Sequence, residues 1–224
     1  ANKTMRIVLD AMGSDACPVP DVEGAVLAAR EFGETIILVG DETRIKTELA
    51  KHSTPGLPIE VVHASQMVTM EDTPSKIVKG KPDSSVHVGL QLVEDGRADA
   101  FVTCGNTGAV LAVATTAKIR RIQGIHRPAL SSIVPFGDRQ VVLIDIGANA
   151  DCKPEYLVQF ALMGSIYAEK ALGTQNPKVG LLSNGEEEGK GNELTKSVLP
   201  LLMASGLNFI GNIEPKEMLE GHTD

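Results

Sequence analysis

The sequence is poor in aromatic residues and in cysteine. Its 224 residues include five phenylalanines, two tyrosines and no tryptophan, so the core must be built from aliphatic side chains and methionine. Three cysteines without a C-x-x-C pair indicate neither a disulfide framework nor a zinc site. The five histidines are scattered without ligand spacing, and we therefore predict no metal site. A reducing, cytoplasmic setting follows as the simpler expectation.

Long hydrophobic runs and a positive charge balance are also missing. No segment approaches 18 consecutive apolar residues, so no transmembrane helix is expected. The polar residues 1–5 lack the apolar core of a signal peptide. The net charge of −8 repels nucleic acid and anionic lipid, and we expect no nucleic-acid partner. Any anionic ligand must therefore be bound by a local patch.

Glycine, by contrast, is frequent, with 22 residues, and strand-like apolar runs alternate with helical patterns. The expected strands are 5–9, 35–39, 59–62, 100–103, 129–134, 141–144, 179–182 and 207–210. This alternation predicts an α/β fold with a mostly parallel sheet covered on both faces, as a single domain over 1–224. The adjacent strands within 129–144, separated by Gly137 and Asp138, predict a hairpin arm that is a candidate dimer contact.

Four loops rich in small and polar residues follow expected strands. In an open parallel sheet, ligands bind beyond the carboxyl ends of the strands. A glycine after a strand often only permits a turn, so each loop alone is weak evidence. Four loops at the same sheet edge favour a functional site. They are 10–15, 104–109, 145–154 and 183–193.

The strongest of these loops contains Gly105-Asn106-Thr107-Gly108, followed by Ala109. Glycine allows the backbone to approach a ligand, and the start of a helix offers unpaired N–H groups and a positive dipole end. We therefore predict phosphate binding at residues 105–109. No Gly-Lys-Ser/Thr follows, and the Gly-x-Gly-x-x-Gly pattern is absent, so neither ATP nor NAD, and no other cofactor, is expected.

Two lysines in other loops, Lys153 and Lys190, are candidates for catalysis. Either could neutralise a phosphate or polarise an acyl carbonyl, and each could equally be a solvated surface lysine. The three adjacent acids Glu186, Glu187 and Glu188 would repel phosphate. We expect at most one of them to pair with a lysine, with the others solvated.

Two further features have competing interpretations. Cys104 precedes the start of a helix and could be a nucleophile towards thioesters, but no His–Asp partner lies nearby, and a small buried residue is the alternative. The positive charges between positions 118 and 127 could dock an acidic partner, or could be a solvated helix end. They are Lys118, Arg120, Arg121 and Arg127.

Taken together, these loops resemble the acyl carrier protein–dependent phosphate acyltransferases of bacterial phospholipid synthesis. The resemblance rests on residues 10–13, 83–85, 105–109, 145–154 and 185–193, in the family's order. It implies a three-layer α/β/α fold similar to phosphotransacetylases and isopropylmalate dehydrogenases. It also implies a homodimer that associates peripherally with the membrane, with acyl carrier protein and inorganic phosphate as partners. The residues expected in substrate-binding loops, beside those already named, are Asp10, Gly13, Ser84, Ser85, Asn149, Asp151 and Asn192.

This chain departs from the family pattern in three places. Ser14 and Ala16 stand where the first loop usually carries a glycine and a histidine. Cys104 replaces what is more often a small unreactive residue. Family members also continue well beyond the position of Asp224, so we expect this chain to lack a C-terminal portion that includes part of the active site or membrane contact.

The expected chemistry is direct attack of phosphate on an acyl thioester. Phosphate is a nucleophile at neutral pH. The leaving group is a thiolate whose thiol has a pKa of about 8.5, so it needs little protonation. Positioning and oxyanion stabilisation are then the protein's contribution, and no Ser–His–Asp set is needed. Two alternatives stay open: a non-catalytic scaffold that binds acyl carrier protein, and a phosphotransacetylase that uses coenzyme A.

Overall fold

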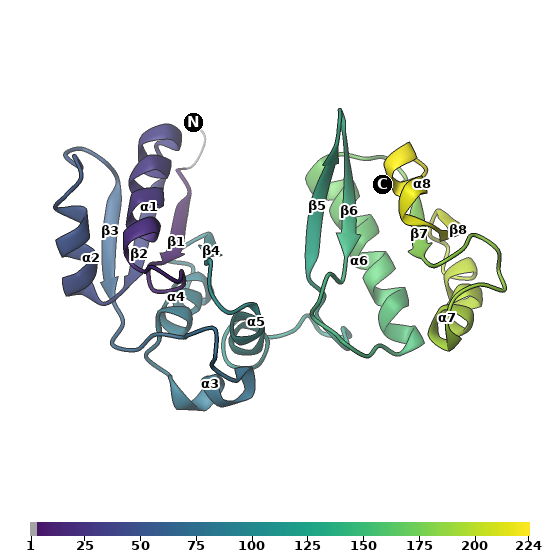
Figure 1. The fold of residues 1–224 in the computed structure, drawn as a ribbon, viewed down its shortest axis with the longest axis horizontal. Helices are drawn as coiled ribbons and strands as arrows, with labels where there is room; N and C mark the ends of the chain where they lie inside the picture. The colour runs from purple at the N-terminus through teal and green to yellow at the C-terminus, as the bar shows by residue number, and fades with distance from the viewer. Residues whose placement is uncertain (1–3) are drawn as a thin grey trace. The chain divides into compact units, whose positions relative to one another are not determined.

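The computed structural model describes residues 4–224 and shows two compact units. The first ends at Arg121, and the second runs from Ile122 to Asp224 (Figure 1). The sequence pattern predicts one domain because strands and helices alternate straight through this boundary, which carries no linker of distinct composition. Each unit has its own sheet and core and is described by itself.

Unit 1 is built on a four-stranded parallel sheet in the order β3-β2-β1-β4. Val8 at the centre pairs with Ile37 on one side and Phe101 on the other. All four carboxyl ends therefore lie at one edge of the sheet. Of the four loops predicted at a common sheet edge, 10–15 and 104–109 follow strands of this sheet, whereas 145–154 and 183–193 follow strands of other sheets, in unit 2. The strands are β1 Arg6–Asp10, β2 Thr35–Gly40, β3 Ile59–His63 and β4 Ala100–Val102.

Five helices accompany this sheet. Asp41 directly follows β2 and is the N-cap of α2, as its side chain predicts. Its carboxylate accepts a hydrogen bond from the Arg44 amide at 3.0 Å. The helices are α1 Val19–Phe32, α2 Glu42–Leu49, α3 Pro74–Gly80, α4 Ser85–Glu94 and α5 Thr107–Thr116. From the sequence, residues 71–81 are expected to be a polar stretch without a helix, whereas the structure has α3 there. Only Ile77 of α3 is buried, so the apolar periodicity is too weak to predict a helix.

The core of unit 1 occupies both faces of the sheet. Val22 of α1 and Ile45 of α2 pack with Leu38 on one face. Ile37 and Leu92 pack on the opposite face, where α4 lies. Burying one such side chain contributes about 1.5–3 kcal/mol, so the two layers together hold the sheet between its helices.

The helix α4 approaches its sheet unusually closely at Gly89. A Cβ atom added there would lie 2.4 Å from Cε2 of Phe101 and 3.1 Å from Cγ1 of Val8. Only glycine leaves room for the Phe101 ring at this crossing. A third cluster, with Val86, Leu90 and Val113, then packs α4 against α5 and thereby positions the start of α5.

Unit 2 contains two separate pairs of strands. β5 Ser131–Phe136 and β6 Arg139–Ile144 pair antiparallel, and β7 Val179–Leu182 and β8 Phe209–Ile213 pair parallel. A hairpin is thus present in the segment where the sequence predicts one, and each strand extends two residues closer to the Gly137-Asp138 turn than expected. The reason is that a two-residue turn lets pairing continue up to the turn itself.

Three helices complete unit 2. Pro154 occupies the first position of α6, where its missing N–H costs no hydrogen bond, as expected. Val198 and Leu202 of α7 pack with Ala161 of α6 beside β7 and β8. The helices are α6 Pro154–Leu172, α7 Glu193–Met203 and α8 Pro215–Glu220. Within residues 4–224, none of the helices combines the length and apolar character that a membrane span requires.

Candidate functional site

The site in unit 1 begins with Asp10, the last residue of β1, which is 1% exposed. Its Oδ1 accepts a hydrogen bond from the Met12 amide at 3.0 Å. Its Oδ2 accepts one from the hydroxyl of Thr103 at 2.9 Å. A single buried carboxylate therefore joins the loop after β1 to the loop after β4.

Glycine at two positions lets these loops touch through their backbones. The Gly105 amide donates to Thr103 Oγ1 at 2.9 Å. A Cβ at Gly13 would lie 2.6 Å from that same oxygen and 3.0 Å from the Gly105 nitrogen. The two predicted loops 10–15 and 104–109 are thus brought together, and a side chain at Gly13 would push them apart.

Asn106 organises the start of α5 with both ends of its side chain. Its Oδ1 accepts a hydrogen bond from the Ala109 amide at 3.0 Å, which makes it the N-cap of the helix. Its Nδ2 donates to the carbonyls of Thr69, Met70 and Asp72 at 3.1–3.4 Å. The start of α5 is therefore tied to the loop that leads from β3 to α3.

The amides of residues 105–109 are not equally available to an anion. Gly105 donates to Thr103, and Ala109 donates to the Asn106 cap. The amides of Thr107 and Gly108 have no acceptor among residues 4–224. These two N–H groups, at the positive end of the α5 dipole, are the ones able to bind an oxyanion.

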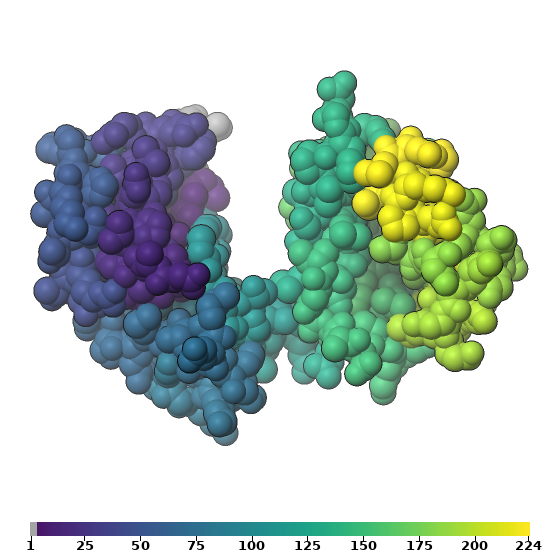
Figure 2. Space-filling view, in the orientation of Figure 1, coloured from purple at the N-terminus to yellow at the C-terminus, as the bar shows by residue number. Residues whose placement is uncertain are grey.

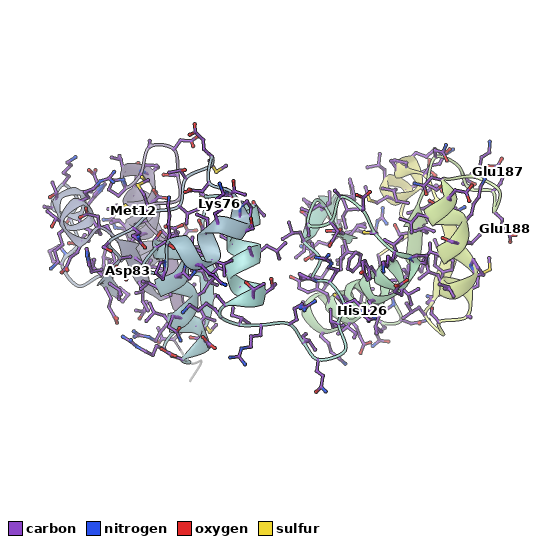
Figure 3. All side chains as sticks on the ribbon, turned by 90° about the horizontal axis from the view of Figure 1, so that it is seen from below. Met12, Lys76, Asp83, His126, Glu187 and Glu188 are labelled. Atoms are coloured by element: carbon purple, nitrogen blue, oxygen red, sulfur yellow. The ribbon has the colours of Figure 1, made fainter. Side chains whose placement is uncertain are left out.

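A cavity of about 350 Å³ adjoins these loops within unit 1. Its walls are formed by Met12, Gly13 and Ser14 from the loop after β1 and by residues 67–71. The second wall is the loop that Asn106 ties to α5. Figure 3 shows Met12 among the loops of this unit. The Asn106 side chain therefore joins this wall of the cavity to the start of α5, and residues 105–109 themselves are not among the lining residues.

Asp21 lies beneath the loop after β1. The hydroxyl of Ser14 donates to Asp21 Oδ2 at 2.5 Å. Burial raises the pKa of the Asp21 carboxyl, and the nearby charge of Asp10 raises it further. Ser14, which stands where the resembled family has a glycine, thus has a structural partner inside the unit.

The predicted substrate residues Ser84 and Ser85 are both 0% exposed. Ser84 is the N-cap of α4, and its Oγ lies 2.9 Å from Nδ1 of His87. Burial lowers the pKa of His87, whose Nε2 lies 3.2 Å from the Val78 carbonyl. The structure places this serine pair in the interior of unit 1, where it supports α4.

In unit 2, the loop after β6 is organised by Asp145, which has a positive φ of 56°. Its carboxylate accepts hydrogen bonds from the amides of Ala148 at 2.9 Å and Asn149 at 3.2 Å. The side chain of Asn149 donates to this carboxylate and to the Pro128 carbonyl. Asn149 is therefore committed to the loop's own structure.

The two candidate lysines both belong to unit 2 and are exposed. Lys153 and Lys190 make no ion pair within residues 4–224, and Asp151 beside Lys153 is also exposed. Asn192 caps α7 by accepting from the Thr195 amide at 2.9 Å. A role of either lysine in binding phosphate stays a prediction from the sequence. The predicted phosphate-binding residues 105–109 belong to unit 1.

The three acids of the loop after β7 differ in their surroundings. Glu186 lies 3.5 Å from the ammonium of Lys216, the single pairing with a lysine that the sequence predicts. Glu187 and Glu188 are exposed, and Figure 3 shows them on the surface of their unit. The charges of this loop are thus directed to solvent and to Lys216.

Cys104 is an exposed free thiol, which differs from the buried residue expected as its alternative. No described histidine makes a hydrogen bond to it. The basic stretch crosses the boundary between the units. Lys118 donates to Oε1 of Gln91 at 2.6 Å, whereas Arg120 and Arg127 are exposed. Residues 4–224 contain no cluster of side chains suited to a metal ion.

Sequence reasoning missed two parts of the unit 1 site. Thr103 follows the apolar residues of β4 directly, and a hydroxyl at a strand end was the available signal. The loop 69–72 carried no signal, because its carbonyls, rather than its side chains, bind Asn106. Backbone groups of this kind are invisible in a residue pattern.

Residues 5–224 match the family model described as fatty acid synthesis protein. The chain is 47% identical over 217 residues to the phosphate acyltransferase of Trichlorobacter lovleyi, which covers 97% of this chain and 63% of that protein. It is 51% identical over 216 residues to the phosphate acyltransferase of Herpetosiphon aurantiacus, which covers 96% and 58%. The chain therefore spans slightly less than two thirds of the length of these relatives.

Solved structures give the fold. The EutD phosphotransacetylase from Staphylococcus aureus matches 96% of this chain and 70% of its own, with a TM-score of 0.65 and 20% identity. A phosphotransacetylase from Streptococcus pyogenes matches 97% and 72%, with a TM-score of 0.67 and 18% identity. These likenesses confirm the predicted α/β class with a mostly parallel sheet. The family itself is shown by the match over residues 5–224 and by the relatives of about half identity: this chain belongs to the fatty acid synthesis protein family.

Proposed function

We propose that the protein transfers an acyl group from acyl carrier protein to inorganic phosphate and so forms an acyl-phosphate for phospholipid synthesis. The observation that carries this proposal is the pair of free amides at Thr107 and Gly108. They lie at a helix start that Asn106 ties to the wall of a cavity. Identity of about half to curated phosphate acyltransferases supports the same reaction.

In the proposed reaction, phosphate is bound at the start of α5, and one of its oxygens attacks the thioester carbonyl carbon. The new bond is carbon–oxygen, and collapse of the tetrahedral intermediate breaks the carbon–sulfur bond. The departing thiolate takes a proton from solvent. Backbone amides and a lysine, Lys153 or Lys190, stabilise the developing negative charge. Asp10 and Gly13 hold the two loops in register for this purpose.

The acyl-donor assay tests the activity directly. Acyl carrier protein loaded with palmitate is incubated with the protein, with and without phosphate, and free carrier thiol is measured. Phosphate-dependent thiol release is expected. Binding without release would instead support a carrier-binding scaffold, and release only from palmitoyl-coenzyme A would support a coenzyme A-dependent phosphotransacetylase.

One variant isolates the amide of Thr107. Thr107 is the first residue of α5, and Asn106 before it is extended, with φ −65° and ψ 102°. Proline is accepted at this position, where it removes the N–H group together with the threonine side chain. Thr107→Pro should therefore lower the acyl-transfer rate by about 10²–10³ without unfolding the helix. Thr107→Ala keeps the amide and serves as the control, so equal rates in the two variants would refute the amide's role.

The lysines are tested separately. If Lys153 or Lys190 stabilises the oxyanion, its replacement by alanine should lower the rate by about 10²–10³. Unchanged turnover in both variants would remove them from the mechanism. Cys104→Ala should leave the rate unchanged, because the proposed reaction forms no enzyme-bound acyl group.

Docking of acyl carrier protein through the basic stretch is part of the proposal. The carrier is an acidic partner in this scheme, and complementary charge steers such encounters. Reversing the exposed Arg120 and Arg127 to glutamate should raise KM for the acyl carrier protein and leave kcat unchanged. The same variants should not change KM for phosphate.

Assembly and location follow from the resemblance. We propose a homodimer, with the hairpin at 129–144 as contact, and a cytoplasmic protein that associates peripherally with membranes. Sedimentation of the protein tests the dimer, and a monomer at micromolar concentration would refute it. Because the membrane contact is expected in the C-terminal portion that this chain lacks, co-sedimentation of a full-length relative with vesicles tests the second point, and no binding would refute it.

A further inference from the structure

Thr103 lies between a buried carboxylate and the predicted phosphate-binding residues 105–109. It follows β4 directly and is partly buried. Its hydroxyl donates to Oδ2 of Asp10 at 2.9 Å and accepts a hydrogen bond from the Gly105 amide, also at 2.9 Å. A chain of two hydrogen bonds therefore runs from the Asp10 carboxylate to the first amide of the loop.

The chemistry of the three groups fixes the direction of both bonds. The Gly105 N–H group can only donate, and a carboxylate can only accept. The single hydrogen of the Thr103 hydroxyl therefore belongs to the bond with Asp10. It is not left over for a bound anion, so Thr103 acts on phosphate through Gly105 and is not itself a ligand.

This arrangement also separates a negative charge from the start of α5. Asp10 is 1% exposed, and its other oxygen accepts from the Met12 amide at 3.0 Å. Gly13 packs against the chain, because a Cβ there would lie 2.6 Å from Thr103 Oγ1 and 2.9 Å from Asp10 Oδ2. Loss of the Thr103 hydroxyl would take the donor from a buried carboxylate and the acceptor from the Gly105 amide.

The loop between β4 and α5 is thus held at both ends. Thr103 holds the amide of Gly105, and Asn106 holds the helix start to the segment after β3. That segment and the loop after β1, blue and purple in Figure 2, meet at the surface of unit 1. The free amides of Thr107 and Gly108 follow directly, so their direction depends on both anchors. Donors that are fixed in advance bind an anion better than donors that must first be ordered.

We propose that Thr103 is a positioning residue for phosphate. Its hydroxyl keeps the Gly105 amide turned towards Asp10 and away from the anion, and so fixes the direction in which Thr107 and Gly108 present their N–H groups. This inference deepens the proposed function and rests on it, because it takes inorganic phosphate as the ligand at the start of α5.

The first test measures phosphate binding without any turnover. Thr103→Val keeps the shape of the side chain and removes the hydroxyl, whereas Thr103→Ser keeps the hydroxyl. Each protein is titrated with inorganic phosphate at constant ionic strength, and the NMR shifts of the Thr107 and Gly108 amides give the dissociation constant. Binding should be about tenfold weaker in Thr103→Val and within about twofold of the unchanged protein in Thr103→Ser. Equal affinity in all three proteins, or the same loss in both variants, would overturn the inference.

A control variant separates positioning from a general loss of stability. Thr115→Val removes a hydroxyl that bonds to the Leu111 carbonyl of the same helix at 2.7 Å. It should leave the phosphate affinity unchanged. If Thr103→Val does not fold, Thr103→Ala takes its place in the comparison with Thr103→Ser.

The acyl-donor assay provides the kinetic readout. Thr103→Val should raise KM for phosphate about tenfold and leave KM for the acyl carrier protein unchanged. A purely structural role would lower kcat and the melting temperature without changing KM for phosphate, and this result would overturn the inference. If the unchanged protein binds phosphate at these amides but releases no carrier thiol, the proposed function fails, and the titration still decides the role of Thr103.

Discussion

The two units differ in how their strands are joined. Unit 1 has four strands in one uninterrupted parallel sheet, with packed helices on both faces. Unit 2 has two strand pairs with a cavity between them. Continuity of backbone pairing, more than the number of apolar residues, separates the tightly packed unit from the open one. The loops 10–15 and 104–109, which include the predicted phosphate-binding residues, belong to the tightly packed unit.

The most sensitive way to sharpen this comparison is native-state hydrogen exchange. The central amides of β1 and β2 open only on global unfolding, whereas edge amides of β6 and β7 open locally. We expect exchange in β1 and β2 to be about 5 × 10³-fold slower, the ratio that a stability near 5 kcal/mol implies. Similar protection in both units would break the comparison.

Next in size is an effect of close packing in unit 1. Gly89→Ala places a methyl group 2.4 Å from the Phe101 ring, so α4 must move away from the sheet. Overpacking of this kind should lower the free energy of unfolding by about 1–3 kcal/mol despite the better helix propensity of alanine. Urea denaturation monitored by far-UV circular dichroism measures it, and an unchanged midpoint would contradict the packing argument.

The matched substitution in unit 2 should act in the opposite direction. Gly164 also lies inside a helix, but its Cβ would meet Ile144 at an ordinary 3.6 Å. Gly164→Ala should therefore raise the free energy of unfolding by about 0.5–1 kcal/mol through reduced backbone entropy of the unfolded chain. A loss of stability would mean that the cavity wall is less open than described.

The smallest effect concerns a buried titratable group of unit 1. Burial lowers the pKa of His87, so the unfolded chain binds its proton more readily than the folded one. The stability from neutral His87 is present above its unfolded pKa of about 6.5 and is lost as pH falls below that value. Unfolding of His87→Gln should depend less on pH between 7.5 and 5.5 than that of the unchanged protein. Parallel profiles for the two proteins would contradict this.

Much of the fold follows from the sequence because local patterns determine it. The predicted strands 35–39 and 179–182 agree closely with β2 and β7, since both are short apolar runs bounded by glycine or polar residues. The pairing of strands is different. Nothing in the order of residues shows that β6 and β7 stay apart, because pairing depends on what else lies between them.

The site was predictable where side chains mark it and unpredictable where backbone groups do. Gly105 and Gly108 indicate the loop, and the structure brings it against Gly13. The sequence could not show that the Ala109 amide donates a hydrogen bond to Oδ1 of Asn106, the helix cap. Because of this bond, the amides of Thr107 and Gly108 are the donors that remain free. Nor could a local pattern reveal that Ser84 is fully enclosed, since burial is a property of the whole unit.

Asn106 has a consequence for redesign of this protein. Serine, threonine and aspartate are all accepted at the start of a helix, so a choice guided by capping preference would treat them as equivalents. None of them offers an NH₂ group to the three carbonyls of Thr69, Met70 and Asp72. Aspartate would even turn a negative oxygen towards them. A chain with serine, threonine or aspartate in place of Asn106 would keep the capped helix α5 but lose the hydrogen bonds that hold the loop 69–72.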